Sequence, residues 1–395
     1  MQRLSLCMIV KDEEERIGSC LESVRDEVDE MIIVDTGSTD RTKEICRSYG
    51  AHVYEYGWKG DFSDARNYGL ERATGDWILW LDADEEVDQQ DRYRLRYALK
   101  QEDVDLYTIS LINYYGDFPP DPDKAFLIAQ HRLFRNQKGF RFKNKIHEVL
   151  NIDEVLVSPE ETKRLQRLPV KVYHYGYMEE VTENKKKFER NLSMLQKELD
   201  ESKNPDPWVY YHMASEYYRV KEYEKSFEFV NNAILNFIFS GKKPPSLLYK
   251  LKYSILLNVG SIDGGLPAID KAIELYPDYV DLHFYRGVFL FIKEEYTEAL
   301  ETFERCLDVG EDQPHHLILK GLGSFQAIYY KGLCMEKMGK LQQAVHYYVQ
   351  SLQLSPTNDS AIESLQDLLT KHPDLISEVK DLECLKLIMP NSSDR

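Results

Sequence analysis

DWILWLDADEE, residues 76–86, is an apolar stretch that runs directly into a cluster of acids. Its apolar side chains do not alternate with polar ones, which is typical of a strand buried on both faces. Asp82 and Asp84 lie on one side of the strand's end, and Glu85 and Glu86 follow them. Carboxylates crowded at the end of a core strand repel one another unless a cation lies nearby. We therefore expect Asp82 and Asp84 to meet a positively charged partner, and Glu85 and Glu86 to begin a solvated segment.

The segments around this stretch alternate between strand and helix patterns from Leu4 to about Tyr175. LSLCMIV, EMIIVDTG, HVYEY and DWILWLDAD each lead into a helical pattern. That alternation predicts an α/β domain with a mostly parallel sheet and helices on both faces. After Asp105 strand patterns follow one another with few helix signals, which favours an antiparallel portion of the same domain.

From Glu179 onward the sequence is helical in pattern and contains a repeat. Small and aromatic residues recur at the spacings of a helix–turn–helix unit of about 34 residues, the tetratricopeptide repeat. The units are predicted to begin at residues 207, 246, 280 and 325. Stacked repeats form a concave surface that usually binds a peptide or another subunit. The predicted organisation is a catalytic domain at residues 1–178, a linking helix at 179–206 and a repeat domain at 207–395.

Composition excludes some classes of function and indicates the cellular compartment. The net charge of −18, from 68 acidic and 50 basic residues, argues against a general nucleic-acid binder. No stretch reaches the roughly 20 apolar residues of a membrane-spanning helix, and the start MQRLSLCMIV is too short for a signal peptide. The six cysteines show no CxxC pair, which favours buried free thiols in a reducing compartment. We expect a cytoplasmic protein.

Polar residues follow all four early strands, where such folds bind ligands at the carboxyl edge of a parallel sheet. They are Glu13 or Glu14 after the first strand, Asp35 after the second, Trp58, Asp61 and Arg66 after the third, and Asp82 and Asp84 after the fourth. One acid after a strand is usually a helix cap or a turn residue, and Asp61 suits a cap. The combination at four strand ends indicates a ligand site.

The order and the residue patterns of these segments resemble those of the family 2 glycosyltransferases, which have the GT-A fold. The resemblance rests on MIVKDEEERIGSCLESV, EMIIVDTGSTDRT and DFSDARNYGLERATGDWILWLDADE. It covers residues 4–88 closely and extends more loosely to about residue 178. Within the family the chain is most similar to members with tetratricopeptide tails, such as the sublancin-type peptide S-glycosyltransferases, through its segments KIHEVL and VYHYGY.

The resemblance implies a UDP-sugar donor and a Mg²⁺ or Mn²⁺ cofactor. It assigns nucleotide-sugar binding to Val10, Glu13, Asp35, Trp58, Asp61, Arg66, Asp82, Ala83 and Asp84. Asp84 is the expected direct metal ligand, and Asp82 would reach the metal through water or face the ribose. Asp35 would hydrogen-bond the uracil or ribose, and Arg66 the base or diphosphate. His174 resembles a position near the metal, although a buried histidine between two tyrosines is an equally good interpretation.

The chemistry of the donor agrees with these assignments. A leaving diphosphate develops negative charge that a hard divalent cation neutralises, and such cations usually take only one or two protein carboxylates. An inverting transferase also needs a base near the acceptor. Glu148 in KIHEVL is our first candidate and His147 the close alternative. The pair also suits an ordinary hydrogen-bonded turn.

The predicted function is transfer of a hexose, with UDP-glucose favoured, to a Cys or Ser side chain of a peptide or protein. The repeats would bind that acceptor or a second copy of the enzyme. Sugar-to-sugar transfer for cell-surface glycans and a catalytically inactive repeat scaffold are the alternatives. A nucleotidyltransferase is disfavoured because KDEEER stands where a glycine-rich phosphate loop is needed, and a dehydrogenase because no GxGxxG follows a strand.

Overall fold

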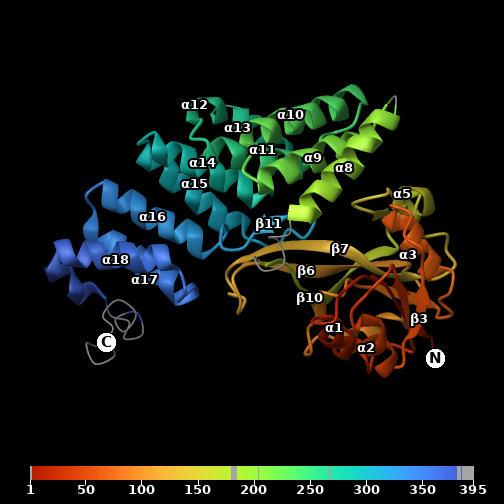
Figure 1. The fold of residues 1–395 in the computed structure, drawn as a ribbon. Helices are drawn as coiled ribbons and strands as arrows, with labels where there is room; N and C mark the ends of the chain where they lie inside the picture. The colour runs from red at the N-terminus through yellow and green to blue at the C-terminus, as the bar shows by residue number, and fades with distance from the viewer. Residues whose placement is uncertain (1, 179–184, 203, 267, 380–383, 385–395) are drawn as a thin grey trace. The chain divides into compact units, whose positions relative to one another are not determined.

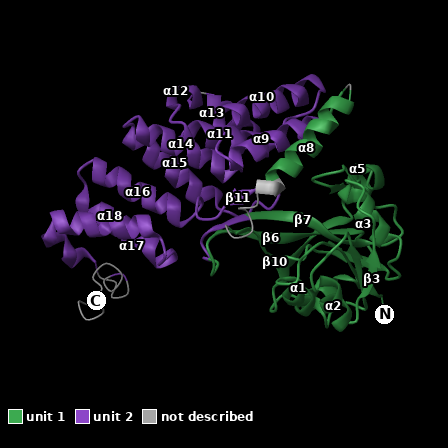
Figure 2. Cartoon of the chain, in the orientation of Figure 1, with its two compact units in different colours: residues 1–120, 127–205 green, residues 121–126, 206–395 purple. Residues whose placement is uncertain are grey.

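The computed structural model of the chain describes residues 2–178, 185–202, 204–266, 268–379 and 384 (Figure 1). These residues form two compact units, which Figure 2 distinguishes by colour. The first comprises residues 1–120 and 127–205, and the second comprises residues 121–126 and 206–395. Residues 179–184 of the predicted linking helix lie outside the described residues. The domain boundaries at 178 and 207 remain predictions.

The first unit alternates strands with helices and then continues mainly in strands. Its early elements are β1 (Leu4–Val10), α1 (Ile17–Val24), β2 (Glu30–Asp35), α2 (Thr42–Ser48), β3 (His52–Glu55), α3 (Phe62–Leu70), β4 (Trp77–Trp80), β5 (Glu85–Val87) and α4 (Tyr93–Ala98). They are followed by β6 (Leu106–Gly116), β7 (Ala125–Arg135), β8 (Phe142–Lys143), β9 (Val149–Leu150), α5 (Ile152–Val155), α6 (Pro159–Thr162), β10 (Leu165–Met178) and α8 (Lys185–Glu201). The alternation agrees with the predicted α/β class.

One sheet runs through this unit, and its described strands follow the order β3-β2-β1-β4-β7-β6-β10-β5. β1 pairs in parallel with β2 and with β4, and β2 pairs in parallel with β3. Since these four strands run the same way, their carboxyl ends lie at one edge of the sheet. Val10, Asp35 and Trp80 mark that edge.

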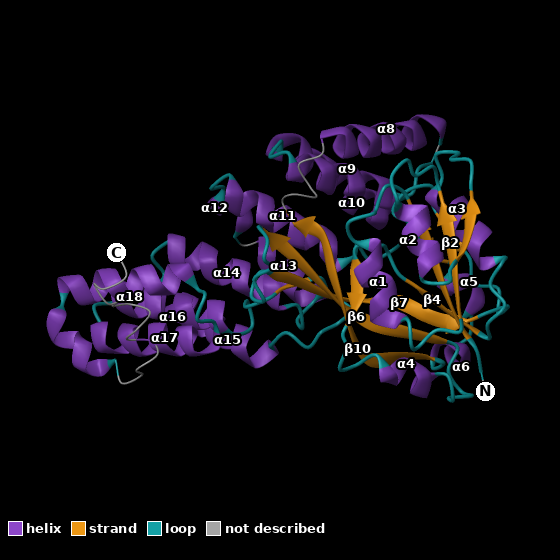
Figure 3. Ribbon diagram, turned by 60° about the horizontal axis from the view of Figure 1, so that its bottom comes forward, coloured by secondary structure: helices purple, strands orange, loops and turns teal. Residues whose placement is uncertain are grey.

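Both faces of this sheet are buried. Leu6 and Met8 of β1 belong to a core that includes Leu21 of α1, whereas Cys7 between them packs on the opposite face with Leu70 of α3. Figure 3 shows the strands of the sheet with α1 and α3 beside them. This two-sided burial explains why the strands are continuous apolar runs in the sequence.

The later strands differ from the antiparallel arrangement that the sequence favours. β4 pairs antiparallel with β7, and β5 pairs antiparallel with β10. However, β10 runs parallel to β6, with register shifts between Leu168 and Lys171 and between His174 and Tyr177. Parallel neighbours are joined through long connections and not through tight turns, so no local turn signal reveals the pairing.

The second unit is almost entirely helical (Figure 3). Its helices are α9 (Pro207–Arg219), α10 (Tyr223–Phe239), α11 (Ser246–Asn258), α12 (Ile262–Gly265), α13 (Ala268–Leu275), α14 (Val280–Ile292), α15 (Tyr296–Val309), α16 (Phe325–Lys337), α17 (Leu341–Leu354), α18 (Asp359–Lys371) and the 3-10 helix η1 (Pro373–Glu378). The first helices of the four predicted repeats begin at Pro207, Ser246, Val280 and Phe325. The repeat frame is therefore confirmed.

Small residues let the paired helices of a repeat approach each other. A Cβ atom on Gly332 of α16 would lie 2.6 Å from the ring of Tyr348 in α17, where Ala344 is fully buried. The long connection after α15 contains β11 (Ile318–Leu319). Next to β11, the Lys320 ammonium lies 2.9 Å from the carboxylate of Asp123 within the same unit.

None of the helices in the described ranges is long and apolar enough to cross a membrane. All six cysteines are buried and free, as the sequence predicts.

Candidate functional site

Asp35 at the end of β2 is almost completely buried, with 1% of its surface exposed. Its Oδ1 accepts hydrogen bonds from the backbone amides of Gly37 and Ser38, at 3.1 and 3.0 Å. Its Oδ2 is buried and has no hydrogen-bond donor within the described part of the chain. A buried carboxylate oxygen without a donor is costly, so this atom is suited to a donor group of a ligand. Val10 of β1 pairs with Asp35 in the sheet.

Asp82, beyond the end of β4, is joined to Glu148 through one arginine. Arg66 Nη2 donates to Asp82 Oδ1 at 2.7 Å, and Arg66 Nε donates to Glu148 Oε1 at 2.6 Å. Burial alone would raise the pKa of Asp82, but the charges of Arg66 and Arg132 and the hydrogen bond from Arg66 lower it to about 2. Asp82 is therefore ionised at neutral pH.

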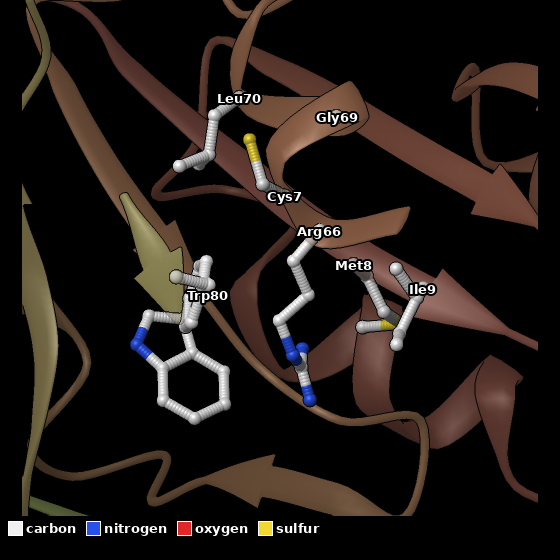
Figure 4. A pocket seen from close by; sticks show the side chains of 8 residues that line it. Cys7, Met8, Ile9, Arg66, Gly69, Leu70 and Trp80 are labelled. Carbon is white, nitrogen blue, oxygen red and sulfur yellow. The ribbon is translucent and has the colours of Figure 1, made fainter. Parts of the chain in front are cut away.

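Arg66 is positioned by α3 and by two aromatic rings. Asp61 caps α3, because its side chain accepts a hydrogen bond from the Asp64 amide at 2.9 Å. The Arg66 guanidinium carbon lies 4.6 Å from the ring centre of Trp80 and 5.4 Å from that of Phe142. Figure 4 shows Arg66 extending from α3 beside Trp80, at a small cavity lined by β1 and α3. Its Nη1 is buried and has no hydrogen-bond partner among the described residues.

Glu85 corrects one expectation from the sequence, because it does not begin a solvated segment. It is fully buried in β5, and its Oε1 lies 2.6 Å from Arg132 Nη2 on β7. Its Oε2 accepts a hydrogen bond from the Asp82 amide at 2.9 Å, and the neighbouring Glu86 is only partly exposed. Burial raises the pKa of Glu85 to about 7, and the Arg132 charge opposes that shift. The chain itself thus places a cation, the Arg132 guanidinium, among these acids. Its central carbon lies 3.6 Å from the ring centre of Trp80.

Asp84 lies opposite His174 of β10, with 3.5 Å between Asp84 Oδ2 and His174 Nε2. His174 Nδ1 lies 2.7 Å from the side-chain oxygen of Asn113 on β6. Because an amide oxygen only accepts, Nδ1 carries a proton and Nε2 is directed to Asp84. Desolvation alone would lower the pKa of His174, but the hydrogen bond and charge of Asp84, with the charges of Glu85 and Asp82, raise it.

Gly176 lies directly against Asp84 and His174. A Cβ atom on Gly176 would lie 2.5 Å from Asp84 Oδ2 and 2.5 Å from His174 Nε2, so any larger residue would have to displace these side chains. The Asp84 carboxylate suits a hard divalent cation that takes its remaining ligands from phosphate and water, whereas the His174 imidazole is a ligand that Mg²⁺ takes less readily. The Asp84 carboxylate therefore fits the predicted Mg²⁺ or Mn²⁺.

The other predicted site residues occupy the surrounding turns. Glu13 lies in the turn between β1 and α1, and Ala83 is buried between the two aspartates. Trp58 precedes α3 and is 39% exposed. His147 adopts a left-handed backbone, with φ of 54°, next to Glu148. The ligand roles of these residues remain predictions.

Three residues of this region were not found by sequence reasoning. Arg132 carried a signal, because a charged residue within the apolar pattern of HRLFRN is expected to be paired if it is buried. Gly176 gave a weaker sequence signal, since a glycine inside a strand can mark a place where another group approaches the backbone closely. Asn113 gave no sequence signal, because its role depends on the parallel pairing of β6 with β10.

Residues 5–152 match the family described as glycosyl transferase family 2, and residues 325–358 match a tetratricopeptide repeat. The first unit contains a family 2 glycosyltransferase domain. This match includes the site residues from Val10 to Glu148, and His174 lies beyond it.

Two curated relatives match about seven tenths of this chain, and a third matches less than half of it. A TPR repeat-containing protein of Synechococcus elongatus is 31% identical over 284 residues, which is 69% of this chain and 66% of the relative. The SPbeta prophage-derived glycosyltransferase SunS of Bacillus subtilis is 26% identical over 301 residues, which is 72% of this chain and 66% of SunS. An uncharacterized glycosyltransferase of Rickettsia prowazekii is 32% identical over 182 residues, covering 45% of this chain and 61% of that protein.

The chain therefore spans slightly less than two thirds of the length of these relatives. Two of these relatives are named as glycosyltransferases, which agrees with the family 2 domain. The similarity to SunS agrees with the resemblance to the sublancin type.

Proposed function

We propose that this chain is an inverting, metal-dependent glycosyltransferase that moves a hexose from a UDP-sugar to a Cys or Ser side chain of a peptide or protein. UDP-glucose is the favoured donor. The observation that carries the proposal is the pair formed by Asp84 and His174, whose Oδ2 and Nε2 atoms lie 3.5 Å apart. Asp84 follows the end of β4, at the sheet edge where α/β folds bind ligands.

Donor binding would use the buried groups of this edge that have no partner among the described residues. Asp35 Oδ2 would accept a hydrogen bond from the uracil or the ribose, and Arg66 Nη1 would donate to the diphosphate or the base. Asp84 and His174 would hold Mg²⁺ or Mn²⁺, with Asp82 acting through water or on the ribose. When bound, the cation neutralises the negative charge that develops on the leaving diphosphate.

The transfer itself would be a single displacement at the anomeric carbon. The acceptor oxygen or sulfur forms its bond to that carbon from the face opposite UDP, and UDP leaves with the electron pair of the broken bond. Glu148 would take the acceptor's proton, with His147 as the alternative. Glu148 is 12% exposed and already bound to Arg66, so it also orients the arginine that contacts Asp82.

The repeat unit supports a peptide or protein acceptor, because stacked repeats commonly bind extended peptides. Association of two copies through the repeats and a cytoplasmic location belong to the same proposal.

Release of UDP from a panel of UDP-sugars tests the donor site. We expect release to require Mn²⁺ or Mg²⁺, to stop with EDTA, and to fall at least about 100-fold in Asp84→Asn, because removal of a charge-stabilising group typically costs 10²–10³ in rate. Asp103→Asn is the matched control, since Asp103 is exposed and lies outside the site. Equal release with EDTA, or equal release by both variants, would show that the metal assignment is wrong.

Asp35→Asn tests nucleotide recognition separately from the metal. We expect UDP to bind about 10- to 100-fold more weakly in calorimetry, the loss expected for a hydrogen bond to a charged group of about 1.5–3 kcal/mol. Unchanged UDP affinity in Asp35→Asn would remove Asp35 from the donor site.

Acceptor panels distinguish the proposed function from its alternatives. Stimulation of UDP release by Cys- or Ser-containing peptides, with a hexose mass added to the peptide, would support peptide modification. Activity on a glycan without any on peptides would favour sugar-to-sugar transfer. A chain that binds peptides but neither binds UDP nor releases it would be a repeat scaffold.

The identity of the base is tested by comparing Glu148→Gln with His147→Gln. Loss of the base should lower kcat for the acceptor and leave UDP affinity unchanged. If Glu148 only orients Arg66, Glu148→Gln should instead weaken UDP binding together with kcat.

A further inference from the structure

A second group of metal-ligand side chains lies in the helical unit, away from the strand ends. Asp278 follows α13, and His315 and His316 come from the long connection between α15 and α16. Asp278 Oδ2 lies 3.0 Å from His315 Nε2, and Asp278 Oδ1 lies 3.3 Å from His316 Nε2. Within the described ranges, this is the one group of three such residues whose ligand atoms all lie within 4.8 Å of one another.

These separations are those of ligands that share one ion. Zinc bonds to nitrogen and oxygen are about 2.0–2.2 Å long, so two ligand atoms at tetrahedral angles lie roughly 3.3–3.5 Å apart. The distances of 3.0 and 3.3 Å between the ligand atoms are close to that edge length. Small side-chain rotations would therefore bring the carboxylate and both imidazoles onto one centre.

The surroundings of His316 orient it as a ligand. His316 is 2% exposed, and its Nδ1 lies 2.8 Å from the hydroxyl of Ser246 at the start of α11. Its ring stacks on Tyr279, with ring centres 4.3 Å apart and an angle of 14° between the planes. Metal-bound histidines typically make such a hydrogen bond through the second ring nitrogen, which directs the first one at the ion. Here that first nitrogen is Nε2, and it faces Asp278.

The exposed side of the group leaves room for solvent ligands. The side chains of His315 and Asp278 are 58% and 43% exposed, so water has access to the remaining coordination positions. A surface histidine beside an aspartate is often only an ion pair. What distinguishes this group is the second, buried imidazole, which is oriented by Ser246 and Tyr279 onto the other oxygen of the same carboxylate.

We propose that Asp278, His315 and His316 bind one divalent transition-metal ion of the zinc or nickel type, with water completing its coordination. Two imidazoles favour such ions, whereas Mg²⁺ prefers oxygen ligands. The site is thus chemically distinct from the one at Asp84. The ion would fasten the connection after α15 to the loop between α13 and α14.

The contacts around the group indicate a structural role. Leu317, next to His316, accepts a hydrogen bond from Tyr279 at 2.6 Å and one from the buried Lys250 at 2.7 Å through its carbonyl. Lys250 in turn pairs with the buried Asp281. The connection between α15 and α16 is therefore already fixed by hydrogen bonds at Leu317, on one side of His316. A metal bound by His315 would fix it on the other side. Binding to the folded form alone would stabilise it in proportion to the logarithm of the metal concentration.

Equilibrium dialysis of the full chain against micromolar Zn²⁺, followed by metal analysis, tests the site. An Asp84→Asn background removes the contribution of the strand-end site. We expect one zinc per chain in that background, and loss of the zinc in His315→Ala and in Asp278→Asn. His346→Ala is the matched control, because His346 is an exposed histidine of α17 outside the group. His315 and Asp278 are mutated in preference to the buried His316 so that folding is retained.

Thermal unfolding gives a second readout. Zn²⁺ should raise the unfolding temperature of the parent, which is the Asp84→Asn chain, and of its His346→Ala variant. EDTA should reverse this rise. The His315→Ala variant should show no rise with Zn²⁺. Absence of zinc from the dialysed parent, or equal zinc in the parent and in both site variants, would overturn the proposal. Since none of these measurements involves UDP or an acceptor, the result is independent of the proposed transferase activity.

Discussion

Two arginines from distant parts of the sequence balance the acids beyond β4. Arg66 of α3 binds Asp82, and Arg132 of β7 binds Glu85. The sequence shows that positive charge is needed at this strand end, and the structure shows that part of it is built in. Asp84 contacts neither arginine at ion-pair distance but faces His174, so it is the acid of this group best placed for a cation.

The Glu85–Arg132 pair gives a test at the residue scale. Removing one partner of a buried ion pair leaves an uncompensated charge, so Glu85→Ala should destabilise the fold by about 3–5 kcal/mol. Replacing both, Glu85→Leu with Arg132→Met, should recover most of that loss. Chemical denaturation, monitored with a spectroscopic probe in the first unit, gives the free energy of unfolding of the single and the double variant.

The exposed pair Glu22–Arg25 provides the control for this experiment. Its side chains are each 61% exposed at 3.8 Å, so Glu22→Ala should change stability by no more than about 1 kcal/mol. A Glu85→Ala effect as small as that of Glu22→Ala would contradict the buried-pair interpretation.

At the scale of elements, β10 completes the site. It carries both His174 and Gly176, and its register with β6 shifts between His174 and Tyr177. His174 and Gly176 are two residues apart, so they share one face of the strand, and both lie against Asp84.

Gly176→Ala tests that arrangement. The new methyl group would lie 2.5 Å from Asp84 Oδ2 and His174 Nε2, so these side chains must separate. We expect the apparent affinity for Mn²⁺ in UDP release to fall at least about tenfold, equivalent to about 1.4 kcal/mol, while circular dichroism remains unchanged. Gly18→Ala in α1 is the control, because a Cβ there meets only ordinary contacts at 3.9 and 4.0 Å. Wild-type metal dependence in Gly176→Ala would exclude a cation bound between Asp84 and His174.

The sequence predicts elements well where the signal is local. The four repeat starts coincide with helix starts because small residues such as Gly332 and Ala344 are required at fixed spacings for helix packing. The carboxyl edge of the parallel sheet can also be predicted, since the apolar segments that form the strands are followed by acidic residues. The pairing of β10 with β6 and the burial of Glu85 were not predictable, because each depends on residues far apart in the chain.

At the scale of the whole molecule, one histidine in each unit responds to acid in the same direction. Burial lowers the pKa of His131 in the first unit and of His283 in the second. The pKa of Asp29, Asp88 and Asp105 is also lowered, because hydrogen bonds and neighbouring cations outweigh the effect of burial. Groups with a lowered pKa in the folded state stabilise it above their unfolded pKa and lose that contribution as the pH falls.

The contributions of these groups should therefore be lost in two stages as the pH falls, whereas His174 and Glu85, whose pKa is raised, act in the opposite direction. The histidines act first, below their unfolded pKa of about 6.5, and the aspartates act below about pH 4. His283 donates through Nε2 to the Pro277 carbonyl at 2.8 Å, and Arg286 and Arg305 further disfavour its protonation. His283→Gln keeps a donor but cannot titrate. Thermal unfolding in EDTA should show that the fall in Tm between pH 7.5 and 5.5 is smaller in this variant by about 2–4 °C, the shift that about 1 kcal/mol produces in a unit of this size. Equal pH dependence in the two proteins would mean that His283 is protonated as readily in the folded chain as in the unfolded one.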